Sequence, residues 1–121
     1  MNRFTHKTVL VTGGTTGIGL ATAQAFAAEG ARVVVTGRNE ADLATARATL
    51  GEQALAVRND AADPASARQL ARTLGDAGIT LDAVFINAGM ARFASLADAD
   101  EALWDQMFAT NVKGPFFQLQ A

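Results

Sequence analysis

Four short apolar runs rich in β-branched residues recur along the chain, and each is continuous rather than alternating between apolar and polar positions. They are Val9-Leu10-Val11, Val33-Val34-Val35, Leu55-Ala56-Val57 and Ala83-Val84-Phe85-Ile86. Each run is short enough for a strand, and a continuous apolar run is typical of a strand covered on both faces. The pattern therefore predicts a parallel sheet with helices on each side.

Stretches with helical start and stop signals separate these runs. Gly30 is placed to stop the first helix, and the side chain of Asn39 can cap the second, with Asp42 three residues later. Asp63-Pro64 is a further start signal, because a proline in the first helical position costs no hydrogen bond. We expect helices from about Gly17 to Glu29, from Asn39, from Asp63 and from around Asp98 to Asp100.

The fourth expected helix combines an apolar face with a helix-disrupting pair. Its apolar side chains are Leu103, Trp104, Met107 and Phe108. Gly114-Pro115 follows, and a proline inside a helix removes a hydrogen bond and clashes with the preceding turn. We expect this pair to kink or break the helix. We interpret Trp104 and Met107 as core or subunit-interface residues.

The order of these elements predicts the topology. Strands joined through helices in this way use right-handed crossovers, which gives an α/β, Rossmann-type doubly wound sheet with strand order 3-2-1-4. Ligands of such sheets bind at the carboxyl ends of the strands, where the winding reverses. Here that crevice is expected between the strand ending at Thr12 and the strand ending at Asn87. We expect residues 1–121 to form one domain, because no composition shift marks a second.

Composition excludes several classes of partner. The formal net charge of −2 lacks the basic excess typical of proteins that bind nucleic acid or anionic membranes, so we expect neither partner. Cysteine is absent, which removes disulfides and thiolate metal sites. The first eight residues contain no apolar signal segment, and we expect a cytoplasmic protein. An acidic run is interpreted as helix-start charge rather than a metal site: Asp98, Asp100, Glu101 and Asp105.

A glycine-rich segment, Thr12 to Gly19, joins the first strand to the first helix. At this place a loop can aim the amides of a helix N-terminus at a phosphate. A triphosphate-binding P-loop needs lysine where Leu20 stands, and the common G-x-G-x-x-G fingerprint does not match either. The alternative is structural: Gly13 and Gly17 serve a tight turn, and Gly19 serves close helix packing.

The segment does match Thr-Gly-x-x-x-Gly-Ile-Gly, and so resembles the glycine motif of the short-chain dehydrogenase/reductase family. Ile86-Asn87-Ala88-Gly89 is similar to the family's Asn-Asn-Ala-Gly motif, with Ile86 in place of the first Asn, and Asn111 to Phe117 resembles the segment around its catalytic asparagine. The resemblance implies hydride transfer between a nicotinamide cofactor and a small carbonyl or alcohol substrate. It implies cofactor contacts from Gly13, Thr15, Thr16, Gly17, Ile18, Gly19, Asn87, Ala88 and Gly89.

The end of the second strand, Thr36-Gly37-Arg38-Asn39, carries no carboxylate where an NAD-binding unit usually has one. The guanidinium of Arg38 is suited to a 2′-phosphate, so we predict that Gly37, Arg38 and Asn39 favour NADP(H), with NAD(H) left open. The alternative for Arg38 is a solvated loop cation, but its position after the second strand favours the phosphate. One observation weighs against NADP(H): the basic residue that many similar NADP-preferring members have in the glycine turn is replaced by Thr16.

Asp60-Ala61, after the third strand, resembles the family pair that meets the adenine ring. The alternative for Asp60 is a turn-forming role near the Asp63 cap.

Family members use a tyrosine, a serine, a lysine and an asparagine in catalysis, and Asn111 is the one that can be placed here. The chain has no tyrosine, and its serines and lysines do not lie at the family's spacing. The alternative for Asn111 is a helix amide bonded to a nearby carbonyl at Gly114-Pro115. We expect residues 1–121 to end before the fifth strand of the fold and to be inactive alone. An apolar edge at the fourth strand would then favour self-association of the fragment.

Two other functions stay open. One is a non-catalytic module that binds a dinucleotide as a structural or sensing ligand, and the other is a structural subunit with an empty site. The resemblance also implies a homo-oligomer packed through the fourth helix.

Overall fold

Parallel strands and helices alternate along the chain, as the apolar runs predict. The computed structural model describes residues 2–121. Within this range the strands are β1 (Thr8–Val11), β2 (Arg32–Gly37), β3 (Leu55–Arg58) and β4 (Ala83–Phe85). The helices are α1 (Gly17–Ala28), α2 (Glu40–Leu50), α3 (Pro64–Asp76), α4 (Glu101–Phe108) and α5 (Gly114–Gln120), with a π-helical segment, η1 (Ala109–Lys113), between the last two. The strand order is β3-β2-β1-β4 and all pairs are parallel, which confirms the predicted topology.

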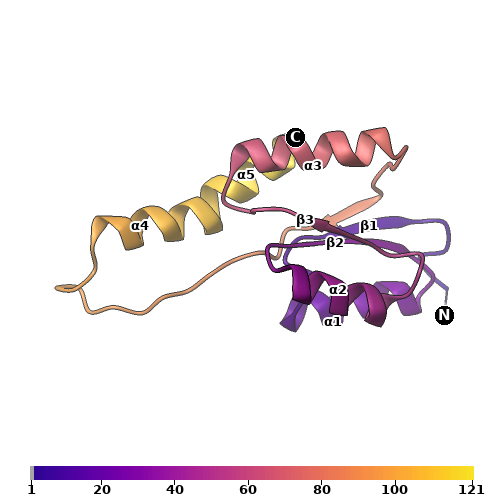
Figure 1. Ribbon diagram of the computed structural model, residues 1–121, viewed down its shortest axis with the longest axis horizontal. Coiled ribbons are helices and arrows are strands. Elements are labelled where there is room, and N and C mark those ends of the chain that lie inside the picture. Colours follow the sequence, from indigo (N-terminus) through magenta and orange to yellow (C-terminus); the bar gives the residue numbers. More distant parts are fainter. Residues whose placement is uncertain (1) are drawn as a thin grey trace.

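Both faces of the sheet are covered, with α1 and α2 on one side and α3 and α5 on the other (Figure 1). Successive side chains of a strand point to opposite faces, so each central strand must supply two cores. Val9 and Val11 of β1 pack on the side of α1 and α2, whereas Leu10 packs with Leu70 and Leu74 of α3. This two-sided burial explains why β1 and β2 are continuously apolar, whereas the residues of β4, at the edge of the sheet, are exposed.

The helix starts expected from the sequence are present. The Asn39 side chain accepts a hydrogen bond from the Asp42 amide at 3.0 Å, and Asp63 caps α3 by accepting from the Ala65 amide at 2.9 Å. Asp100 caps α4 in the same way, accepting from the Leu103 amide at 2.8 Å. These side chains satisfy amides that have no partner inside the helix.

Asp82 joins the starts of β1 and β4. Its carboxylate accepts hydrogen bonds from the Thr8 amide at 2.9 Å and from the Lys7 ammonium at 3.0 Å. The bond from Thr8, followed by that from Lys7, holds the pKa of the Asp82 carboxyl below its ordinary value. The contact fixes β4 at the edge of the sheet, next to β1.

Of the two outcomes expected at Gly114-Pro115, a break of the fourth helix does not occur, and a kink stays a prediction. Gly114 keeps right-handed helical angles (φ −57°, ψ −54°), and its amide donates to the carbonyl of Ala109, five residues earlier. Pro115 lies in the first turn of α5, directly after the π-helical segment. The turn before Pro115 is π-helical, so the hydrogen-bond pattern changes there while the helix continues.

Trp104 is not a core residue. It is 64% exposed and stacks on Phe108, which is 47% exposed, with ring centroids 4.6 Å apart. Leu103 and Met107 are half-buried. In Figure 1, α4 extends away from the sheet. Within residues 2–121, no helix combines the length and apolar character required to span a membrane.

Leu43 provides a test of the core between the sheet and α2. Its side chain is completely buried with Val9, Val33 and Val35. Replacing it by alanine removes buried methyl groups and leaves a cavity, so we expect Leu43→Ala to lower the free energy of unfolding by about 2–5 kcal/mol. Chemical denaturation measures this. The control, Leu96→Ala at a 97% exposed position, should change it by less than about 0.5 kcal/mol, and equal losses in the two variants would refute the burial argument.

Candidate functional site

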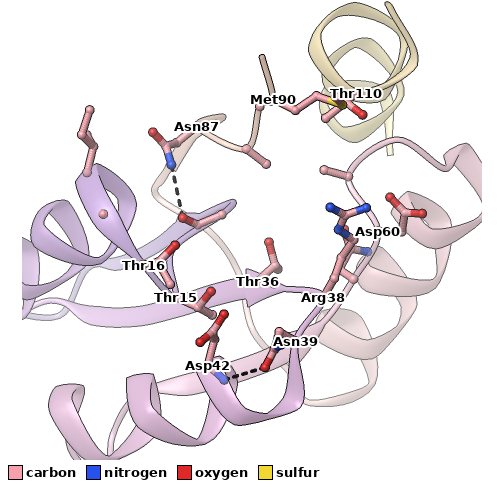
Figure 2. Close-up of a pocket in the computed structure, with 18 residues that line it drawn as sticks. Thr15, Thr16, Thr36, Arg38, Asn39, Asp42, Asp60, Asn87, Met90 and Thr110 are labelled. Carbon is pink, nitrogen blue, oxygen red and sulfur yellow. Dashed lines mark hydrogen bonds between the residues drawn. The ribbon is translucent and has the colours of Figure 1, made fainter. Parts of the chain in front are cut away.

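A cavity of about 740 Å³ lies at the carboxyl ends of the strands (Figure 2). Its walls come from the turn after β1, the end of β2 and the loops after β3 and β4, with Thr110 of η1 added from the helical side. This is the place expected for a ligand in a doubly wound sheet. Its volume is in the range typical of small-molecule and cofactor sites.

Most residues predicted for the site line this cavity. They are Gly13, Thr15, Thr16, Gly17, Ile18, Gly37, Arg38, Asn39, Asp60, Ala61, Asn87, Ala88 and Gly89. Gly19 and Asn111 do not line it. Five lining residues were missed: Thr36, Asp42, Asn59, Met90 and Thr110. The position of Thr36 and Asn59 at strand ends could have identified them, whereas Asp42 and Thr110 belong to helices whose orientation the sequence does not show.

The glycine turn is closely packed on one side and open on the other. Gly13 has φ +61°, and a Cβ built there would lie 2.9 Å from Cα of Ala88. A Cβ at Gly19 would overlap the carbonyl oxygen of Gly13 and lie 2.6 Å from the Asn87 amide nitrogen. Gly17, with φ +55°, faces open space in which a Cβ would meet nothing within 4 Å. A Cβ at Gly14 would lie 2.8 Å from the carbonyl oxygen of Val11, so the turn needs glycine for packing at three positions, while Gly17 borders the cavity.

The N-terminus of α1 opens on this cavity without a side-chain cap. Thr16 occupies the cap position and makes no capping hydrogen bond, and the first turn contains no acidic residue. The first intrahelical bond runs from the Leu20 amide to the Thr16 carbonyl at 3.1 Å. The amides before Leu20 therefore have no intrahelical acceptor, and they carry the positive end of the helix dipole. This end of α1 suits an anion such as a pyrophosphate.

Thr12 holds the loops after β1 and β4 together. Its buried hydroxyl accepts hydrogen bonds from the amides of Asn87 at 2.9 Å and Ala88 at 3.1 Å. The Asn87 side-chain amide donates in turn to the carbonyl of Gly13 at 3.2 Å, the upper dashed line in Figure 2. The Asn-Ala-Gly segment is thus fixed against the glycine turn.

Asn111 binds the backbone of the loop after β4 instead of a carbonyl near Gly114-Pro115. Its Oδ1 accepts from the Met90 amide at 2.9 Å, and its Nδ2 donates to the Met90 carbonyl at 2.8 Å. A Cβ at Gly89 would lie only 3.1 Å from Oδ1. Asn111 thereby positions Gly89 and Met90, which line the cavity, and its catalytic role stays a prediction.

Asp60 makes the turn-forming contact considered for it, and its contact with an adenine ring stays a prediction. One carboxylate oxygen accepts from the Ala62 amide at 3.0 Å, which is the turn-forming contact. The residue also lines the cavity. Asn59 anchors the same loop, because its side-chain amide donates to the backbone and hydroxyl oxygens of Ser66, each at 2.9 Å.

Arg38 projects into the cavity on the side of Asp60 (Figure 2). Among residues 2–121 its guanidinium has no hydrogen bond or ion pair with another side chain or carbonyl. The described part of the chain also contains no group of three or more His, Cys, Asp or Glu side chains placed to hold a metal. The open helix N-terminus and the unpaired guanidinium together fit an anionic ligand that carries more than one phosphate.

Gly19 allows a test of the turn. Alanine is favoured over glycine in helices by about 1 kcal/mol, so a helical Gly→Ala exchange is usually stabilising. We expect Gly19→Ala to lower the thermal midpoint instead, because its Cβ would overlap the Gly13 carbonyl oxygen. The matched control is Gly75→Ala in α3, where a Cβ meets nothing within 4 Å and stability should stay equal or rise. Stabilisation by both exchanges would contradict the packing of the turn.

Comparison with known proteins agrees with this geometry. The short chain dehydrogenase family model matches residues 7–121. A short chain dehydrogenase/reductase of Macrophomina phaseolina is 42% identical over 115 residues, which cover 91% of this chain and 66% of that protein. The NADP-dependent (R)-specific alcohol dehydrogenase of Lentilactobacillus kefiri is 39% identical over 119 residues, covering 96% of this chain and 47% of that protein.

Solved structures give the same result. A short chain dehydrogenase/reductase family protein superposes with a TM-score of 0.90 at 42% identity, covering 100% of this chain and 49% of that one. The chain thus spans about half the length of most of these relatives. The parallel sheet, the glycine turn and these matches show that the chain belongs to the short-chain dehydrogenase/reductase family, whose members include dehydrogenases.

Proposed function

We propose that residues 1–121 are the cofactor-binding half of an NADP-dependent oxidoreductase that transfers hydride between the nicotinamide ring and a carbonyl or alcohol substrate. The observation that carries this proposal is the uncapped N-terminus of α1, which opens on the cavity at the strand ends. When bound, the dinucleotide supplies or accepts the hydride. Residues 1–121 bind the dinucleotide and orient it.

In this proposal each wall of the cavity holds a different part of the dinucleotide. The amides at the start of α1 bind the pyrophosphate, and Arg38 pairs with the 2′-phosphate. Asp60 and Ala61 meet the adenine ring, while Asn87 to Gly89 line a ribose. Asn111 contributes to catalysis by positioning the loop after β4.

The proton donor or acceptor is proposed to lie outside residues 1–121, since these residues contain no tyrosine. The same observation favours a second candidate, a module that binds the dinucleotide without catalysis. Intact mass of the natural protein discriminates between the two, because the first requires a longer polypeptide. An assay of hydride transfer by that polypeptide then tests the activity itself.

A substitution at Arg38 tests the cofactor preference. We expect Arg38→Ala to weaken NADPH binding by about tenfold or more, because a charge-assisted hydrogen bond to phosphate is lost. NADH binding should change by less than about twofold, since NADH lacks that phosphate. Fluorescence titration of both dinucleotides measures the two affinities.

Arg58→Ala is the matched control, because Arg58 ends β3 but does not line the cavity. An unchanged NADPH to NADH ratio in Arg38→Ala would reject the preference. Absence of any dinucleotide binding to the unsubstituted protein would reject the proposed function.

We also propose that two copies associate through the last helical region. Exposed apolar side chains are spaced along α4, η1 and α5: Trp104, Phe108, Val112, Phe116 and Leu119. An apolar surface of this kind marks an interaction site in soluble proteins. We propose a second copy of this chain as the partner, because the family resemblance implies a homo-oligomer.

Light scattering tests the association. A charge in a desolvated interface is costly, so we expect Phe108→Glu to lower the mass in solution towards that of one chain. Phe93→Glu is the control, because Phe93 is fully exposed on the loop before α4. A monomeric unsubstituted protein, or equal dissociation by both variants, would contradict this interface.

A further inference from the structure

The ionisable side chains that line the cavity do not favour an anion on balance. They are Arg38, Asp42 and Asp60. Asp60 is engaged in the turn after β3 through its bond from the Ala62 amide. Asp42, in the first turn of α2, is different, because its carboxylate has no such partner among residues 2–121.

Asp42 presents a free carboxylate to the cavity on the side of Thr15. Its backbone amide is bonded by the Asn39 side chain at 3.0 Å, but within residues 2–121 no donor or cation bonds its carboxylate oxygens. The residue is half-buried, and in Figure 2 the carboxylate points from α2 towards Thr15. It is therefore an acidic group aimed into the cavity rather than into solvent alone.

The space around this carboxylate is restricted. A Cβ at Gly37 would lie 2.8 Å from both Oγ1 and Cγ2 of Thr15, so the glycine turn and the end of β2 are in close contact here. Thr15, Gly37, Arg38, Asn39 and Asp42 form one wall of the cavity. An anion seated at this wall meets one cation and one carboxylate, and the Asp42 amide cannot serve it because Asn39 already occupies that donor.

We propose that Asp42 is a specificity-determining residue that opposes the adenosine 2′-phosphate and so limits the preference for NADP that Arg38 creates. This inference rests on the proposed function, in which the cavity binds a nicotinamide dinucleotide. The carboxylate repels a phosphate dianion, yet it can accept a hydrogen bond from a ribose hydroxyl. Arg38 and Asp42 together make a site that accepts both dinucleotides.

The test compares Asp42→Asn with Glu40→Gln. Both acids lie in the first turn of α2, where each interacts with the helix dipole, but Glu40 does not line the cavity. The probes are adenosine 2′,5′-bisphosphate and adenosine 5′-monophosphate, which differ only in the 2′-phosphate. Calorimetric titration of each variant gives the ratio of the two affinities.

We expect Asp42→Asn to raise the preference for the bisphosphate by about tenfold, as loss of one like charge several ångströms from a phosphate implies. Glu40→Gln should leave the ratio within about twofold of the unsubstituted value, since an exposed charge outside the cavity is screened. The gain in Asp42→Asn should shrink as salt is raised, because the effect is electrostatic. Asp42→Ser repeats the comparison with a smaller neutral side chain.

The outcomes separate this inference from the proposed function. If both probes bind but neither neutral variant changes the ratio, the role of Asp42 is refuted and dinucleotide binding stands. A change of equal size in Glu40→Gln, or one that does not decrease in high salt, also refutes it. If neither NADPH nor NADH binds the unsubstituted protein, the proposed function fails first.

Discussion

The first turn of α1 lies against the carbonyl oxygen of Gly13, at a distance that excludes any side chain at Gly19. The rest of the site depends on this contact. It brings the N-terminus of α1 to the end of β1, beside Asn87 in the loop after β4. These three parts of the chain together form one wall of the cavity. A Cβ at this position would push the helix away, and the amides that face the cavity would move with it.

The polar groups around the cavity fall into two sets. One set forms hydrogen bonds with backbone or side-chain groups of neighbouring loops and so holds those loops in place: Thr12, Asn59, Asn87 and Asn111. In the described range 2–121, the α1 amides before Leu20 have no acceptor within the helix, and the side chains of Arg38 and Asp42 have no hydrogen-bond or ion-pair partner. A rigid frame with a few unpaired groups is what a preorganised binding site requires, since little ordering is left for the ligand to induce. The opposite charges of Arg38 and Asp42 then decide which anion is favoured.

Much of this fold could be predicted because its signals are local. The caps at Asn39, Asp63 and Asp100, and the apolar runs of the strands, each depend on a few neighbouring residues. The π-helical turn could not, and neither could the close approach of the Ala61 carbonyl to Gly114, where no side chain fits, because this contact spans 53 residues. The Asn111 to Met90 pair spans 21 residues, and the entry of Asp42 into the cavity depends on how α2 meets the sheet, which the sequence does not show.

The last helical region contributes to the site through contacts three residues apart in sequence. Asn111 bonds the backbone of Met90 in the loop after β4, and Gly114 packs on Ala61 in the loop after β3. Both loops line the cavity, so one helix sets the distance between its two walls. The π-helical pattern widens the turn between these contacts, and an uninterrupted α-helix would rotate one contact relative to the other. The irregular turn is therefore part of how the cavity keeps its shape, and the same segment places Thr110 on its rim.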